Sequence, residues 1–160
     1  MADNKLFISF SAPREFPECD YYFKTIVRQA ILATLEFEDF RRDTEVSVTF
    51  CDNEYIKKLN KAYRNKDSAT DVLSFPLYDL SSEAEELMID DEALELGDIV
   101  ISIERAKEQA KEIGNTFLEE IAFLTVHSTL HLLGYDHERS EEDEKLQCDA
   151  QKCIVATLEI

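Results

Sequence analysis

The three histidines of this 160-residue chain, His127, His131 and His137, all lie within eleven consecutive positions. His127 and His131 are four residues apart, so a helix would place both imidazoles on one face with a rise of about 6 Å between them. Gly134 follows where such a helix would need a residue that tolerates left-handed backbone angles in order to stop. The chain can turn there and bring His137 back from outside the helix. This spacing predicts a preformed site in which three histidines hold one metal ion.

The predicted ligand set also indicates which metal is held and for what purpose. Three neutral imidazole nitrogens suit zinc or a neighbouring transition metal, and three protein ligands leave one position for water. Structural zinc sites usually have four ligands and favour cysteine, so this set is typical of a catalytic site. A helical histidine pair alone arises by chance often enough to mean little. The third histidine after the glycine favours metal binding over that simpler explanation.

The same histidine and glycine spacing occurs in the metzincin proteases, H-E-x-x-H-x-x-G-x-x-H. In those enzymes the glutamate after the first histidine is the general base that deprotonates the zinc-bound water. Ser128 occupies this position here, and a hydroxyl is far too weak a base to replace a carboxylate. The sequence therefore favours other hydrolytic reactions over peptide hydrolysis.

The composition is that of an ordinary soluble protein, with 44% apolar and 32% charged residues. A chain of this length can form a sizeable core, so we expect a single domain spanning residues 1–160. No apolar run approaches the roughly 20 residues of a membrane span, and the N-terminus shows no signal-peptide pattern. The cysteines form no C-x-x-C pair, which favours reduced thiols in a cytoplasmic protein: Cys19, Cys51, Cys148 and Cys153.

The charge is strongly negative and unevenly distributed. The net charge of −18 disfavours nucleic-acid binding, which normally needs positive potential. Residues 79–95 carry eight acidic side chains and no basic one, whereas residues 57–66 carry five basic side chains and no acidic one. A basic segment of this kind is, by itself, more often a solvated helix face than a binding surface. It nevertheless allows a locally basic patch on an acidic protein.

The hydrophobic pattern predicts the elements that must position these side chains. Alternating or short apolar runs predict strands at residues 6–10, 45–51, 72–77 and 99–103. Helical spacing and capping residues predict helices at 20–35, 53–65, 106–113, 116–131 and 140–158, with an acidic loop at 79–96. The order βαβαββααα indicates an α+β fold, a small mixed four-stranded sheet covered by about five helices. The histidines would then lie on a buried central helix.

Three stretches of the sequence resemble the motifs of a known family. Residues 59–76 read LNKAYRNKDSATDVLSFP, residues 97–101 read GDIVI and residues 127–137 read HSTLHLLGYDH. The family patterns are Y-R-x-K-D-x-P-T-D-V-L-S-F-P, G-D-I and H-G-x-L-H-L-x-G-Y-D-H, in this order and at similar spacing. On these motifs the chain resembles the YbeY family of bacterial metal-dependent endoribonucleases, over about residues 45–145.

Two positions depart from the family patterns. Ser128 stands where the family usually has glycine, and Ala69 stands where it usually has proline. Neither position is a predicted ligand, so the predicted metal site is unaffected. Serine at 128 adds a small side chain to the metal helix and could slightly alter access to the metal.

The resemblance implies a single-strand-specific endoribonuclease that acts in ribosomal RNA maturation, especially of the small subunit, and in ribosome quality control. It implies one zinc ion per chain, held by His127, His131 and His137. It implies ribosomal RNA and the ribosome or ribosome-associated proteins as partners, with no membrane. It also makes Arg64 the position that matches the functional arginine of the family.

The chemistry of Arg64 is compatible with this implied role. A guanidinium is always charged, can hold a phosphate through two hydrogen bonds and can stabilise the negative charge that grows in the transition state. The simpler alternative is a salt bridge from Arg64 to Asp67 or Asp71. Asp98 or Asp136 could orient a ligand imidazole, and the sequence offers no candidate for a general base.

Two other classes of function stay open at this point. The first is a metallohydrolase of another class, such as an atypical peptidase, which would need a carboxylate near the open metal position. The second is a non-enzymatic ribosome- or protein-binding factor, in which the metal only fixes the helix end and the following turn. That factor would have a fourth protein ligand and would unfold when its metal is removed.

Overall fold

The computed structural model describes residues 4–78, 93–136 and 140–160 of the chain. Two features of the sequence therefore lie outside the described residues, namely His137 and most of the acidic segment, residues 79–92. The described part contains four strands and five helices in the predicted order: β1 (Leu6–Ser11), α1 (Tyr21–Phe37), β2 (Thr44–Cys51), α2 (Asn53–Arg64), β3 (Val72–Pro76), β4 (Leu94–Ser102), α4 (Ile103–Ile113), α5 (Phe117–Leu132) and α6 (Glu141–Ala156).

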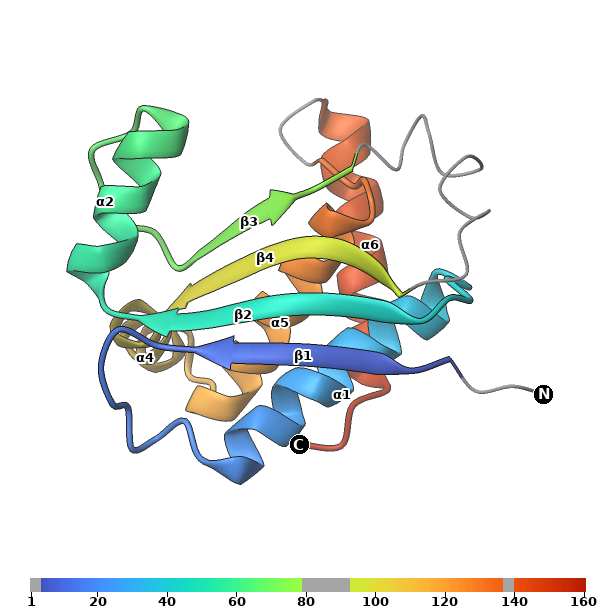
Figure 1. The fold of residues 1–160 in the computed structure, drawn as a ribbon, viewed down its shortest axis with the longest axis horizontal. Coiled ribbons are helices and arrows are strands. Elements are labelled where there is room, and N and C mark those ends of the chain that lie inside the picture. The colour runs from blue at the N-terminus through green and yellow to red at the C-terminus, as the bar shows by residue number, and fades with distance from the viewer. Residues whose placement is uncertain (1–3, 79–92, 137–139) are drawn as a thin grey trace.

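The four strands form one mixed sheet in the order β1-β2-β4-β3 (Figure 1). Strands β1, β2 and β4 are parallel, and β3 pairs antiparallel with β4 at the edge of the sheet. The predicted mixed four-stranded sheet with five helices is thus confirmed for the described part of the chain. In the same part, no helix is both long and apolar enough to cross a membrane.

The main core lies between one face of the sheet and helices α1, α4 and α5. Alternate residues of the strands, such as Val46, Val48 and Phe50 of β2, point into it and are buried. Helix α1 contributes Phe23 and three further apolar residues at helical spacing. A second cluster joins α1, α5 and α6, so α5 is enclosed between the sheet and two other helices. The prediction of a buried central helix is confirmed.

Burial of α5 requires partners for its polar side chains. The helix begins with the predicted capping box, in which Thr116 and Glu119 exchange hydrogen bonds of 2.9 and 3.1 Å. The hydroxyls of Thr125 and Thr129, both buried, each donate to a backbone carbonyl one turn earlier at 2.7 Å. These bonds let a helix with hydroxyl groups lie in an apolar interior at little cost.

Two boundaries differ from the sequence prediction. β4 begins at Leu94, within the predicted acidic loop, and it ends at Ser102, so Ile103 is the first residue of α4. The loop was predicted to extend to residue 96 because acidic residues dominate its composition. Leu94 and Leu96 are nevertheless buried, and Leu94 pairs with Thr44 of β2. Tertiary pairing therefore overrides local composition here.

Gly97 of β4 lies where the edge strand and the central helix come closest to each other. A Cβ at this position would be 2.2 Å from the carbonyl oxygen of Phe75 and 3.1 Å from a methyl group of Leu132. The φ angle of Gly97 is +146°, a conformation that side-chain-bearing residues rarely adopt. Only glycine permits this contact between β3, β4 and the end of α5.

We expect Gly97→Ala to lower the free energy of unfolding by about 3 kcal/mol, because backbone strain and overpacking add at this position. Urea unfolding of the native and variant proteins measures the difference. Gly114→Ala is the matched control, since Gly114 also has a positive φ, +84°, but has no atom within 4 Å of the added Cβ. Equal losses in the two variants would show that close packing at Gly97 is unimportant.

Candidate metal centre and cleft

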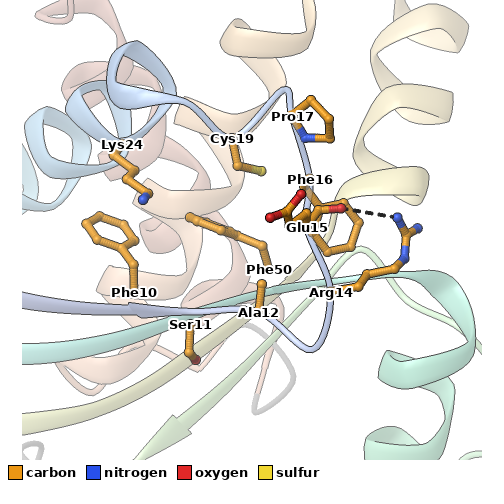
Figure 2. Close-up of a pocket in the computed structure, with 10 residues that line it drawn as sticks. All are labelled: Phe10, Ser11, Ala12, Arg14, Glu15, Phe16, Pro17, Cys19, Lys24 and Phe50. Atoms are coloured by element: carbon orange, nitrogen blue, oxygen red, sulfur yellow. Dashed lines mark hydrogen bonds between the residues drawn. The ribbon is translucent and has the colours of Figure 1, made fainter.

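One cavity of about 420 Å³ opens beside the ends of β1 and β2, under the loop that leads into α1 (Figure 2). Its walls include the rings of Phe10, Phe16 and Phe50. Burial, with the neighbouring Glu18, raises the pKa of the Cys19 thiol to about 12, so this thiol stays protonated and is a poor nucleophile at neutral pH. Among the described residues that line this cavity there is no histidine. It does not contain the chemistry that the sequence predicts.

A second cavity, of about 480 Å³, brings the predicted site residues together. His127 and His131 of α5 line it on one side, and Arg64 at the end of α2 lines it on another. The loop between α2 and β3 and the edge strand itself complete the wall, with Thr70 and Ser74 among their contributions. We refer to this cavity as the cleft. His137, the third predicted ligand, lies outside the described residues.

Helix α5 presents its two histidines side by side shortly before it ends. Both imidazoles are half-buried, and the helix ends at Leu132, one residue after His131. Gly134 has a φ of +108°, and its N–H donates to the carbonyl of His131 at 3.1 Å. The predicted glycine stop is therefore present. Within the described residues, no group of three or more histidine, cysteine, aspartate or glutamate side chains is arranged to hold a metal ion.

Two buried glutamines of α6 fix the ring of His127. The Oε1 atom of Gln151 lies 2.7 Å from Nδ1 of His127, and the Nε2 atom of Gln147 donates to the backbone carbonyl of His127 at 3.3 Å. The amide nitrogen of Gln147 also lies 3.3 Å from Nδ1, but the oxygen of Gln151 is closer, and an amide oxygen can only accept; we therefore assign the proton to Nδ1 and the lone pair to Nε2. This is the tautomer that a metal ligand coordinating through Nε2 needs. The donor chemistry of the described residues therefore fits a divalent metal.

The sequence did not indicate these glutamines as site residues. Gln147 and Gln151 are four residues apart, and they are only 1% and 5% exposed. Such a pair on the inner face of a predicted helix is the signal that could have been noticed, because buried amides need partners. The sequence cannot tell which partner they find 20 to 24 residues away.

Arg64 is the last residue of α2 and is exposed at the cleft. The helix ends there because Asn65 takes a left-handed conformation, with a φ of +56°. The two carboxylates that the sequence offers as alternative partners have contacts of their own: Asp67 pairs with Lys61 at 4.0 Å, and Asp71 accepts from Thr70, Val72 and Gln109.

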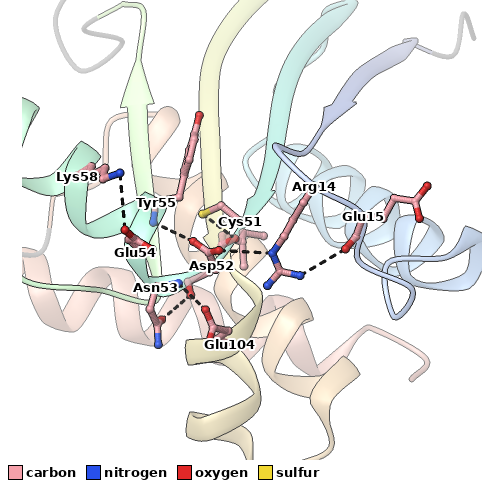
Figure 3. Close-up of polar contacts among 11 residues, drawn as sticks. Arg14, Glu15, Cys51, Asp52, Asn53, Glu54, Tyr55, Lys58 and Glu104 are labelled. Atoms are coloured by element: carbon pink, nitrogen blue, oxygen red, sulfur yellow. Dashed lines mark hydrogen bonds and ion pairs between the residues drawn. The ribbon is translucent and has the colours of Figure 1, made fainter.

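The start of α2 is anchored to two neighbouring elements (Figure 3). Asp52 caps the helix by accepting from the backbone N–H of Tyr55 at 2.9 Å, and this bond, with Arg14, lowers the pKa of the Asp52 carboxyl. The N–H of Asn53 donates to Glu104 of α4 at 3.0 Å. These contacts fix the N-terminal end of the helix, so Arg64 is carried on a helix that is anchored at its far end.

Of three further positions singled out in the sequence, one lines the cleft and two do not. Asp136 lines the cleft. Asp98 does not, because it is exposed and alternates with Ile99, whose side chain points toward α5. Ser128 is fully buried and also lies outside the cleft lining. Its hydroxyl has no hydrogen-bond partner among the described residues.

A partly buried polar network supports the wall of the cleft. The side-chain amide of Gln109 in α4 donates to Asp71 in the cleft wall and to Glu120 of α5, both at 3.1 Å. Glu120 is only 1% exposed, and burial raises the pKa of its carboxyl, with a further upward contribution from Asp71 and a downward one from Gln109. Asn60, also buried, donates to the carbonyl of Ser68 at 2.9 Å and so holds the adjoining loop. The wall is therefore tied to both α4 and α5.

The cleft residues lie within a region that matches known proteins. The model of the family "Endoribonuclease YbeY" matches residues 13–159. A protein named Endoribonuclease YbeY from Caldanaerobacter subterraneus subsp. tengcongensis is 54% identical over 142 residues, covering 84% of this chain and 87% of that protein. Its namesake from Clostridium botulinum (strain Loch Maree) is 48% identical over 137 residues, covering 79% and 81%. The solution structure of a Thermotoga maritima protein matches with a TM-score of 0.59 and 27% identity, covering 93% of this chain and 87% of that one.

The raised pKa of Glu120 predicts a loss of stability as the pH rises. Above the ordinary value of 4.5 the unfolded chain gives up this proton more readily than the folded chain does, so the free energy of unfolding falls until the raised folded-state pKa is passed. Glu120→Gln removes this titration. Its unfolding free energy relative to the native protein should therefore rise across that window, as measured by urea unfolding at several pH values.

Glu119→Gln provides a control of opposite sign. The capping box lowers the pKa of the Glu119 carboxyl, so this residue stabilises the fold above its unfolded pKa and loses that effect as the pH falls. The variant should be less stable than the native protein at neutral pH and should converge with it in acid. A Glu120→Gln variant that behaved in the same way would exclude burial as the cause of the Glu120 shift.

Proposed function

This chain belongs to the YbeY family of endoribonucleases, and we propose that it is a metal-dependent, single-strand-specific endoribonuclease. Its place in the cell would be the maturation of ribosomal RNA, especially that of the small subunit, and ribosome quality control. The observation that carries the proposal is the shared cleft, which His127, His131 and Arg64 line from two separate helices. A phosphodiester placed between them would meet a metal site and a guanidinium together.

The metal that we propose is one zinc ion per chain, held by His127, His131 and His137. The support is the orientation of His127, whose Nδ1 is engaged by Gln151 so that Nε2 is the coordinating nitrogen. The chemistry that such a metal supplies is Lewis-acid polarisation of a phosphoryl group and acidification of water. The two imidazoles suit this role because they are the α5 side chains that line the cleft, so a metal held by them would be open to a substrate there.

Arg64 would bind the scissile phosphate and stabilise the negative charge that develops on it. Its planar guanidinium can donate two parallel hydrogen bonds to phosphate oxygens, and this geometry adds specificity to the attraction between charges. Lys66 lies in the same wall and adds a second positive charge. The hydroxyl of Ser74 offers a neutral hydrogen bond, which helps to hold a phosphate backbone in place without excess charge.

The RNA and ribosomal partners follow from the proposed reaction. Single-stranded ribosomal RNA is the substrate class, with the ribosome or its associated proteins as the setting. The five cations of residues 57–66 provide the local positive charge on an acidic protein, although Lys58 and Lys61 are paired with Glu54 and Asp67 at the surface. Such exposed pairs are weak and exchange readily for phosphate contacts.

Removal of the metal, and separately Arg64→Ala, should each abolish most cleavage of single-stranded RNA. We expect the alanine variant to lose about a hundredfold in kcat/KM, because a preorganised charge at the reacting phosphate is removed. Arg64→Lys should recover little of this loss, since lysine cannot form the bidentate contact. Arg41→Ala, at an exposed arginine outside the cleft lining, is the matched control.

The measurement is the initial rate of cleavage by nuclease-free protein, by metal-stripped protein and by stripped protein restored with zinc, with circular dichroism to show that each is folded. Cleavage that survived both stripping and Arg64→Ala would be due to a contaminant, and the proposed site would be wrong. Full activity in Arg64→Lys would show that Arg64 does not bind the phosphate through two hydrogen bonds, and it would leave the rest of the proposed site unchanged.

Gln151 gives a test of the metal site that does not depend on RNA. Gln151→Leu removes the acceptor that fixes His127, so zinc affinity should fall by about ten- to a hundredfold. Competition with a chromogenic zinc chelator measures this, and Gln29→Leu, at an exposed glutamine of α1, is the control. Gln151→Glu should retain affinity because a carboxylate accepts the same hydrogen bond. Unchanged affinity in Gln151→Leu would contradict the assigned orientation.

A further inference from the structure

The residues that line the cleft suit a phosphate and a metal but offer little to the bases of an RNA strand. Among the described residues that line it there is no phenylalanine, tyrosine or tryptophan side chain. Proteins that act on single-stranded nucleic acid usually stack its exposed bases on such rings, because every base has a π-face. An endoribonuclease with this cleft therefore needs an aromatic surface close by.

We propose that Tyr63, supported by Phe75, is a stacking platform for one base of the RNA strand held in the cleft. This inference rests on the proposed endoribonuclease function and adds to it the part of the protein that binds a base. Tyr63 directly precedes Arg64 in α2 and is 70% exposed. It is therefore a large ring that the fold leaves in water beside the proposed phosphate ligand.

The ring of Tyr63 is exposed but held in place. Its centroid lies 5.4 Å from that of Phe75, with the ring planes at 67° in an edge-to-face arrangement. Phe75 is itself partly buried and packs on the small core between α2 and the sheet. Contact with a single ring in this geometry leaves at least one face of the tyrosine open, so the platform is ordered before any base arrives.

The platform lies across the edge strand from the cleft. On β3, Ser74 lines the cleft, and the next residue, Phe75, points to the opposite side of the strand. On α2, Asn60 and Arg64 line the cleft, and Tyr63 is one turn from Asn60 and adjacent to Arg64. A strand whose phosphate is held at Arg64 can place a neighbouring base around this edge and onto Tyr63.

Stacking at this position would favour single strands. A base in a duplex is already paired and stacked on its neighbours, so it cannot turn onto a ring at the edge of the sheet without paying for unstacking. Other aromatic residues fit less well. Phe16 and Phe50 in the smaller cavity are only 8% and 3% exposed, and Tyr21 lies at the start of α1, away from the cleft lining.

The first test is Tyr63→Leu, with Tyr63→Phe as the variant that keeps the ring. We expect Tyr63→Leu to raise KM for single-stranded RNA about tenfold and to leave kcat unchanged, because stacking holds the substrate and does not touch the reacting atoms. Tyr63→Phe should behave as the native protein does. Tyr21→Leu, at a tyrosine that is 86% exposed, is the matched control and should change neither constant.

The second test measures binding without cleavage. Fluorescence anisotropy of labelled single-stranded DNA of about sixteen nucleotides, which an endoribonuclease does not cut, should show the same tenfold weakening in Tyr63→Leu. A series of such strands, each with one abasic site, should identify a position that weakens binding to the native protein but not to Tyr63→Leu. If the base stacks on Tyr63, removing the base and removing the ring abolish the same contact, so the two changes together should weaken binding no more than either change alone.

The outcomes separate the platform from the proposed function. If native protein cleaves RNA and Tyr63→Leu keeps the native KM and affinity, or if the abasic series affects both proteins equally, the platform is wrong. If folded, zinc-loaded native protein fails to cleave RNA, the proposed function is wrong, and the anisotropy series then decides whether Tyr63 still binds a base.

Discussion

The burial of α5 is the constraint on which the rest of the structure depends. This helix lies between the sheet and helices α1 and α6, so its buried polar groups need partners inside the protein, and among the described residues the hydroxyl of Ser128 is an exception. Its threonines bond to their own helix, Glu120 shares the amide of Gln109, and His127 is held by the glutamines of α6. The side of the helix that remains open faces the cleft. The contacts that α6 makes with α5 thus both enclose the helix and orient His127.

The end of α2 shows how one local arrangement can meet two demands. Lys61 and Arg64 lie in the last turn, where positive charge interacts favourably with the negative end of the helix dipole. Asn65 then ends the helix in a left-handed conformation, which turns the chain toward the cleft wall. Arg64, one of the two cations that stabilise the helix end, is thereby placed at the cleft, where Lys66 joins it. This explains how a chain with a net charge of −18 can still concentrate positive charge at one place.

Much of this architecture could be predicted from local signals in the sequence. Helical and strand periodicity gave the order of the elements, and the capping box and Gly134 marked the limits of the central helix. The start of β4 was missed because its pairing with β2, which fixes the strand, is formed with distant residues. Gln109, Glu120, Gln147 and Gln151 were missed for the same reason, since a polar side chain carries no local sign of its distant partner. His137 stays a prediction from spacing.

The sheet order has a consequence for how the chain folds. β4 lies between β2 and β3, and its parallel pairing with β2 joins residues as far apart as Phe50 and Ile101, which are 51 positions apart. Closing so long a loop is slow compared with forming local helices, so the central pairing is expected late in folding. The pairing also joins β2, which leads into α2 and Arg64, to the part of the fold in which β3 pairs with β4 and α5 packs against both of these strands. A partly synthesised or partly folded chain can therefore form its helices, yet it cannot present the histidines and Arg64 to one ligand.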